Sequence, residues 1–150
     1  MHTENDRPVE GTVKKMRLVS ASSMFGPAPT PETVVEQRIT VNSMGRIWFS
    51  TYNFYIPTGL KLIKMRHLQI DKDKARQLLD TVASYFRCWE PLPLVCDGGD
   101  WLLELTDSNN QVFRYSGSLG YDDMEALSES MRKTLGINNL WGFGYVDDEE

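Results

Sequence analysis

Two pairs of strand-like segments in this chain are joined by turns that are too short to contain a helix. The first turn, "NSMG" at residues 42–45, joins "TVVEQRITV" to "RIWFSTYNFY". The second turn, "DSNN" at residues 107–110, joins "WLLELT" to "QVFRYSG". Parallel neighbours need a crossover of a dozen or more residues, so both pairs must be antiparallel hairpins. The sequence therefore excludes a regular βαβ alternation and predicts a sheet built from hairpins.

Apolar residues alternate along these segments, which is typical of a sheet with one buried face. In the first hairpin Val35, Ile39 and Val41 share one side, and Gln37 interrupts them. Residues 12–20 predict an earlier strand. Residues 60–70 continue the extended pattern, with four residues available for burial: Leu60, Leu62, Met65 and Leu68.

Two further segments have the three- and four-residue spacing of amphipathic helices. The first follows Asp71, which suits an N-cap, and runs to Arg87 or Cys88, where "EPLPL" ends it. The second begins near Asp122, with Glu125 three positions later as in a capping box, and stops at Gly136. We expect six helix residues to be largely buried: Leu78, Val82, Phe86, Leu127, Met131 and Leu135.

These patterns together predict an α+β fold. We expect a mostly antiparallel sheet of about 5–7 strands, with two helices packed on one face, in the order ββ(β)α-ββα. The length of 150 residues suits a single domain over residues 12–150. Residues 1–11, rich in charge and poor in apolar side chains, predict a disordered lead, and residues 146–150 predict an acidic tail. The final "NLWGFGYV" fits either a last short strand or an aromatic segment folded on the sheet.

The charge of the chain is distributed unevenly. Residues 1–75 carry 11 Lys/Arg and 7 Asp/Glu, a net charge of +4, whereas residues 76–150 carry 5 and 14, a net charge of −9. This asymmetry fits solvated faces, and it also fits a polarised surface that steers a charged partner. No apolar run has the length of a membrane helix, and the N-terminus lacks a signal-peptide core, so we expect a cytoplasmic protein without membrane contact.

Catalytic chemistry finds little support in the spacing of reactive residues. A Ser-His-Asp triad would have to use His67, and "SGSLG" at residues 116–120 lacks the first glycine of a nucleophile elbow. Cys88 and Cys96 match neither a CxxC redox motif nor a zinc set, and Cys88 suits a small hydrophobe at a helix end. We expect no catalytic residue and no cofactor.

The "CDGGDW" segment at residues 96–101 resembles a binding loop more than any other part of the chain. Asp97 and Asp100 could share a cation, but two carboxylates fall short of the oxygens that calcium or magnesium takes. A phosphate loop would precede a helix and supply a lysine, whereas this loop precedes a strand. A tight strand-entry turn is the better interpretation, and we expect no metal site.

The aromatic strand at residues 46–55 is the main candidate binding element. Ile47 and Phe49 fall on one side, and we expect that side to face the helices. The other side would then expose side chains of the kinds that dominate protein interfaces. The alternative is that the faces are swapped and the tryptophan belongs to the core. The predicted partner-binding residues are Arg46, Trp48, Tyr52 and Tyr55.

Three stretches resemble small uncharacterised proteins of Gram-positive bacteria and their mobile elements. They are "RITVNSMGRIWFSTYN", "WLLELTDSNNQVFRYSGSLG" and "SMRKTLGINNLWGF". The resemblance covers about two thirds of the chain, from residue 33 onward. It implies an α+β domain in a bacterial or phage setting, and it brings no function with it.

The sequence favours a non-enzymatic, acidic protein-interaction module. An inhibitor or immunity-type protein fits this description, with a nuclease or another defence effector as its protein partner. One alternative is a nucleic-acid binder that places Arg46, Lys61, Lys64 and Arg66 on phosphates and uses Tyr52 or Tyr55 for stacking, although the pI near 5.1 disfavours it. Another is an enzyme or small-ligand protein whose site is assembled from scattered residues.

Overall fold

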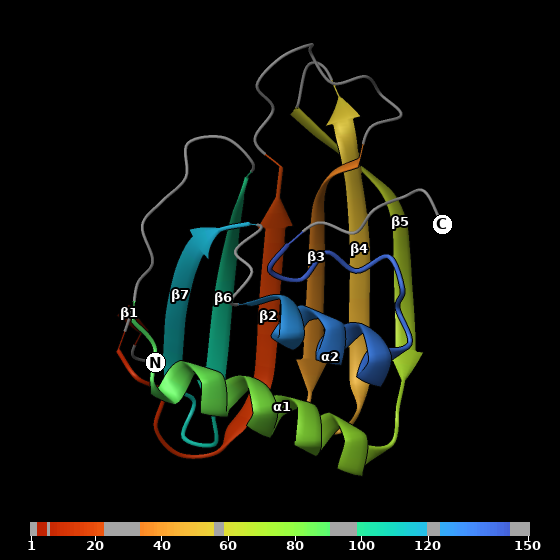
Figure 1. The fold of residues 1–150 in the computed structure, drawn as a ribbon. Coiled ribbons are helices and arrows are strands. Elements are labelled where there is room, and N and C mark those ends of the chain that lie inside the picture. Colours follow the sequence, from red (N-terminus) through yellow and green to blue (C-terminus); the bar gives the residue numbers. More distant parts are fainter. Residues whose placement is uncertain are drawn as a thin grey trace.

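A seven-stranded sheet with two helices on one side forms the fold (Figure 1). The structure, a computed structural model, describes residues 3–5, 7–22, 34–55, 59–90, 99–119 and 124–144, without the side chains of residues 3–5 and 55. The strands are β1 (Thr3–Asn5), β2 (Val13–Ala21), β3 (Val34–Asn42), β4 (Arg46–Tyr55), β5 (Gly59–Gln69), β6 (Asp100–Asp107) and β7 (Val112–Ser118). The helices are α1 (Lys72–Arg87) and α2 (Glu125–Leu135).

The strand order across the sheet is β1-β7-β6-β2-β3-β4-β5. Strands β2 to β7 pair antiparallel, and the short β1 adds to β7 in parallel. The predicted α+β fold is therefore confirmed. The order of elements differs in one respect, because β1 to β5 all precede α1, whereas the predicted order placed two or three strands there. The long-range pairing of β2 with β6 joins the two hairpin regions into one sheet.

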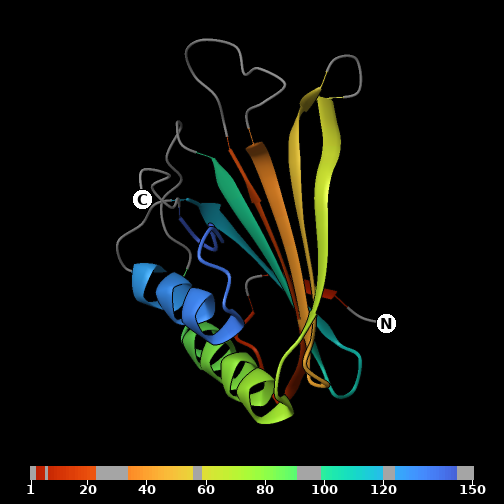
Figure 2. The ribbon, with the colours of Figure 1, turned by 90° about the vertical axis from the view of Figure 1, so that its right-hand side faces the viewer.

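Both helices cover the same face of the sheet, as Figure 2 shows. The alternating residues that face them form one hydrophobic cluster, which includes Ile39, Ile47, Phe49, Trp101 and Leu103. All six helix residues that the sequence predicts to be buried belong to this cluster: Leu78, Val82, Phe86, Leu127, Met131 and Leu135. Burial of side chains of this size supplies most of the folding free energy of a domain.

The predicted caps and turns are mostly in place. The carboxylate of Asp71 accepts a hydrogen bond from the backbone N–H of Asp73 at 2.7 Å, as an N-cap does. Gly136 ends α2 in the left-handed conformation with φ of 69°. Gly45 has φ of 85° in the β3–β4 turn, which requires glycine at that position. Asp122, the predicted capping residue of α2, lies outside the described residues.

The described residues at the start of the chain correct the prediction of a disordered lead over residues 1–11. Thr3–Asn5 pair with β7, and Val9 is 2% exposed within the hydrophobic cluster. The hydroxyl of Tyr115 donates a hydrogen bond to the carbonyl oxygen of Arg7, and Arg87 donates to that of Gly11. Residues 3–5 and 7–11 therefore contact the sheet and α1. The predicted acidic tail at 146–150 lies outside the described residues.

Strand β5 lies at the edge of the sheet, and two of its residues that were available for burial are exposed. Leu62 and Met65 are 48% and 56% exposed, because they lie opposite Tyr52 and Ser50 on the face of the sheet that the helices do not cover. Cys88, which the sequence suggested as a small hydrophobe at a helix end, is exposed. None of the described helices combines the length and apolar composition needed to span a membrane.

The segment after α2 packs between the helices and the sheet, which agrees with the predicted aromatic segment folded on the sheet. Phe143 is 1% exposed, and four buried polar side chains hold the surrounding backbone.

Ser20 donates to the carbonyl oxygen of Gly142 at 2.6 Å, and Gln37 donates to the carbonyl oxygen of Asn139 and accepts from the N–H of Trp141. Ser128 accepts a hydrogen bond from Phe143, and Arg132 donates to the carbonyl oxygens of Leu140 and Trp141. Gln37, the interruption in the β3 pattern, is explained by this contact.

Candidate functional site

The face of the sheet opposite the helices carries the candidate site. In Figure 2 neither α1 nor α2 lies over this face. Residues directly opposite each other in neighbouring strands share a face, and β4 and β5 pair Trp48 with His67 and Tyr52 with Leu62. The Ser50–Met65 pair lies between them. We call Trp48, Tyr52, Leu62, Met65 and His67 the outer patch.

The tryptophan of the outer patch is stacked and not inserted into the core. The rings of Trp48 and His67 lie 5.0 Å apart and nearly parallel, with an interplanar angle of 9°. Trp48 is half-buried, while its chain neighbours Ile47 and Phe49 are 0% and 2% exposed on the other face. The predicted orientation of this strand is therefore confirmed, and the alternative with swapped faces is excluded. The stack restricts both side chains before any partner arrives.

The tyrosine of the outer patch is held in a similar way by β3. The guanidinium carbon of Arg38 lies 4.3 Å from the centroid of the Tyr52 ring. The same guanidinium pairs with Glu36, which is directly opposite Tyr52 in the β3–β4 ladder. The ring therefore has a fixed orientation with one face turned to a cation. A pre-ordered aromatic side chain loses little conformational entropy on binding.

Aliphatic side chains surround these rings with exposed apolar surface. Leu62, Ile63 and Met65 are 48%, 51% and 56% exposed, three of the five exposed large hydrophobic residues among those the structure describes. Ile63 is the extra residue of a β-bulge, since Thr51 and Tyr52 pair with Lys64 and Leu62. Apolar residues gathered on one exposed strand indicate an interaction surface, whereas single scattered ones do not.

The rest of the outer face is polar and carries a net positive charge. By strand alternation its charged residues are Lys15, Arg17, Arg38, Arg46 and Arg114 against Glu36, Asp100 and Glu104. A shallow depression of about 470 Å³ lies among them, with Lys14, Lys15, Arg17 and Arg114 in its lining. Arg114 is paired with Glu104, and Lys14 with Asn110. The outer face therefore differs in sign from the whole chain, whose net charge is −5.

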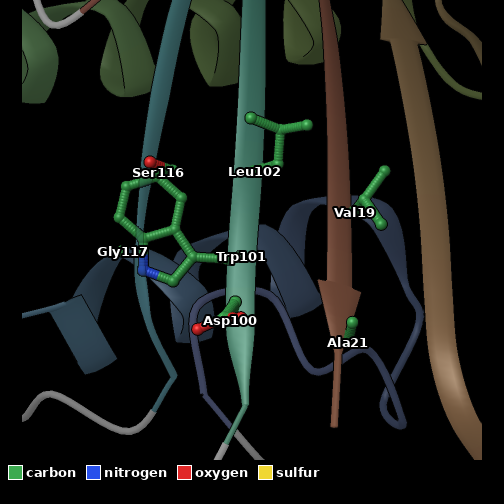
Figure 3. Close-up of a pocket in the computed structure, with 7 residues that line it drawn as sticks. All are labelled: Val19, Ala21, Asp100, Trp101, Leu102, Ser116 and Gly117. Atoms are coloured by element: carbon green, nitrogen blue, oxygen red, sulfur yellow. The ribbon is translucent and has the colours of Figure 1, made fainter. Parts of the chain in front are cut away.

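A second depression of about 300 Å³ lies where β2, β6 and β7 run side by side (Figure 3). Val19, Ala21 and Leu102 give it an apolar lining, and Asp100 and Ser116 are its polar side chains. Among the described residues that line it, Asp100 is the single carboxylate and none is a histidine. This arrangement offers neither a nucleophile–base pair nor a ligand set.

Residues capable of metal or acid–base chemistry remain separated in the described part of the chain. It contains no group of three or more His, Cys, Asp or Glu side chains placed to hold a metal ion. His67 stacks on Trp48, and Glu104 forms an ion pair with Arg114. Asp97 and Cys96 lie outside the described residues, so the predicted strand-entry turn is seen only from Gly99 onward.

The structure brings together three of the four predicted partner-binding residues. Arg46, Trp48 and Tyr52 alternate along the outer side of β4, with Arg46 exposed, whereas the side chain of Tyr55 is outside the described part. The prediction missed Arg38 and His67, which fix the two rings, and it treated Leu62 and Met65 only as available for burial. Finding Arg38 and His67 would have required the strand register, because each lies on a strand next to the one that carries the ring it contacts. No protein-family model and no curated protein sequence matches the chain.

Proposed function

We propose that this chain is a non-enzymatic protein-binding module that binds its partner through the outer patch. The observation that carries the proposal is the outer patch itself, in which an ordered Trp and Tyr lie among Leu62 and Met65 at about half exposure. Trp, Tyr and Arg are the residues that most often dominate interface energies. Leaving this much apolar surface in water is unfavourable for a monomer, and covering it with a partner would remove that cost.

An inhibitor or immunity-type role, with a bacterial or phage-defence effector as partner, remains our proposal for the biological setting. Such a protein needs a rigid scaffold and a complementary surface, and it needs no catalytic group. The charge of the outer face adds one constraint. Arg46 is exposed at the patch and Arg38 flanks it, so the contacted region of the partner would be apolar and acidic. If the partner is a nuclease, the contact would fall outside its basic nucleic-acid groove.

A comparative capture experiment tests the proposed function. Wild-type protein, the double variant Trp48→Ala/Tyr52→Ala and the control Lys133→Ala would be immobilised and exposed to extract of the source cells. Lys133 is exposed on α2, on the other side of the molecule. We expect a defined partner to be retained by wild type and control and lost from the double variant, as quantified by mass spectrometry. Equal retention by all three proteins would refute the proposed site.

A second candidate function is favoured by one observation, the basic depression lined by Lys14, Lys15, Arg17 and Arg114. These cations and the aromatic rings on the same face would suit single-stranded nucleic acid, which binds through phosphate contacts and stacking. The salt dependence of the binding affinity distinguishes the two candidate functions. Nucleic-acid binding would weaken steeply with salt, by roughly tenfold or more between low and physiological ionic strength, whereas binding through the apolar patch would change much less. A fluorescence titration with a short single-stranded oligonucleotide measures this dependence.

A further inference from the structure

Strand β5 has the features of an edge that accepts a further strand. It is 11 residues long, and among the described strands only β4 lies beside it. An edge strand presents backbone N–H and C=O groups that a further strand can pair with. The opposite edge is β1, with three residues, which offers far less pairing. The two edges of this sheet are therefore unequal, and only β5 is long enough to guide a partner.

The two faces of β5 carry different side chains over residues 64–69. Met65 and His67 lie on the outer face, opposite Ser50 and Trp48. Lys64 and Arg66 lie on the helix side, opposite Thr51 and Phe49. Neither of these two cations forms an ion pair with an acidic residue in the described part of the chain. Over residues 64–69 the helix side therefore carries two cations and Leu68, and the outer face carries Met65 beside His67 and Gln69.

The bulge at Ile63 sets the length of an uninterrupted docking segment. Regular pairing with β4 runs without a break from Lys64 to Gln69 and shifts register at Ile63. A strand that docks beside residues 64–69 would follow a regular ladder, while the bulge would disturb pairing farther along. This segment includes both unpaired cations and lies next to Trp48.

We propose that β5 binds an extended strand of another protein whose side chains alternate between acidic and apolar. This inference rests on the proposed function and names the chemistry of the partner. The acidic side chains would lie beside Lys64 and Arg66, and the apolar ones would extend the outer patch beside Met65. Backbone pairing supplies affinity in this mode of recognition, and alternate side chains supply specificity.

A second copy of this chain is a poor occupant of the same edge. Antiparallel pairing of two β5 strands about a twofold axis would place Lys64 and Arg66 of both copies on one face of the joined sheet. Like charges at neighbouring cross-strand positions are destabilising. The same cations that attract an acidic strand therefore oppose self-association.

The test uses the full chain and three short capped peptides that differ in one property each. The first alternates Glu and Val, the second alternates Lys and Val, and the third is the Glu/Val peptide with N-methyl groups on the amides of one edge. Affinity would be measured by titration, and the binding site would be mapped from backbone amide shifts in NMR spectra. We expect the Glu/Val peptide to bind along residues 64–69, about tenfold or more tighter than either other peptide. The variant Lys64→Glu/Arg66→Glu should reverse the preference in favour of the Lys/Val peptide.

Three results would overturn the inference. They are equal affinity for the Glu/Val and Lys/Val peptides, unchanged affinity after N-methylation, and a concentration-dependent dimer of the wild-type chain that dissociates in Lys64→Glu. The proposed function has a separate readout. If N-methylation has no effect but Trp48→Ala still abolishes retention of the cellular partner, strand addition fails while protein binding through the outer patch stands.

Discussion

Single glycines show how tightly the turns of this protein depend on residue type. Gly45 and Gly59 both have positive φ, at 85° and 91°. A Cβ at Gly45 would also collide with the backbone carbonyl oxygen of Ile70, whereas at Gly59 it would meet nothing within 4 Å. The N–H of Ile70 donates a hydrogen bond to the carbonyl oxygen of Gly45 at 2.8 Å. This contact anchors the β3–β4 turn to the start of α1.

The two glycines therefore form a matched pair for substitution by alanine. Gly59→Ala should cost about 1–2 kcal/mol of unfolding free energy, the usual cost of a left-handed non-glycine residue. Gly45→Ala should cost more than about 3 kcal/mol, because the clash adds to the same backbone strain. Urea denaturation of both variants measures the difference. Equal losses would show that the turn moves freely away from Ile70.

At the scale of elements, α2 and the segment after it behave as one unit held by Arg132. This arginine is 8% exposed, and its guanidinium donates to the carbonyl oxygens of Leu140 and Trp141. It also pairs with Glu125 at 3.0 Å and Glu129 at 3.2 Å. A buried guanidinium stabilises the fold only while its N–H groups keep their hydrogen-bond and ion-pair partners.

Replacement of Arg132 by methionine should destabilise the protein by about 2–4 kcal/mol, because two buried carbonyl groups lose their donor. The neighbouring Lys133 is exposed, and Lys133→Met should change stability by less than about 0.5 kcal/mol. Thermal unfolding followed by circular dichroism compares the two variants. A similar melting temperature for both would mean that the C-terminal segment does not depend on Arg132.

The cost of replacing a leucine by alanine should also differ between α2, which packs on the sheet, and β5, whose outer face is uncovered. Leu127 of α2 is 6% exposed and Leu62 of β5 is 48% exposed. Leu127→Ala should cost about 2–5 kcal/mol, as for other core leucines. Leu62→Ala should cost less than about 1 kcal/mol, since its side chain already meets water. A loss below about 1 kcal/mol for Leu127→Ala in urea would contradict its assignment to the core.

The difference between these elements also explains which structural features can be predicted from the sequence. Alternation identified the buried side of β4, and helical spacing identified Leu78, Val82 and Phe86, because both signals are local. The edge position of β5 depends on β2 pairing with β6, which is a contact between distant segments. Nothing in "LKLIKMRHLQI" records that choice, so the sequence leaves Leu62 and Met65 available for burial. The Arg38–Tyr52 and Trp48–His67 contacts were missed because their geometry depends on strand register.

At the scale of the whole molecule, the fold is one-sided. Both helices and residues 137–144 pack on one face of the sheet, and the other face carries an apolar patch beside a basic region. The residues of the outer patch therefore lie outside the hydrophobic cluster that holds the helices on the sheet. The charge is also uneven, since basic residues outnumber acidic ones on the outer face although the net charge of the chain is −5. We propose that the outer face is kept for a partner.

Substitutions of the neighbouring residues Trp48 and Phe49 distinguish a binding role from a structural role, because the two side chains point to opposite faces of the same strand. The measurement is the unfolding free energy and the partner affinity of Trp48→Ala and Phe49→Ala, determined on the same preparations. We expect Phe49→Ala to lose about 3–5 kcal/mol of stability. Trp48→Ala should lose less than about 1 kcal/mol of stability but roughly 2 kcal/mol or more of binding free energy. Full partner affinity in Trp48→Ala, or a loss of stability as large as that of Phe49→Ala, would show that Trp48 is not a binding residue on an uncovered face.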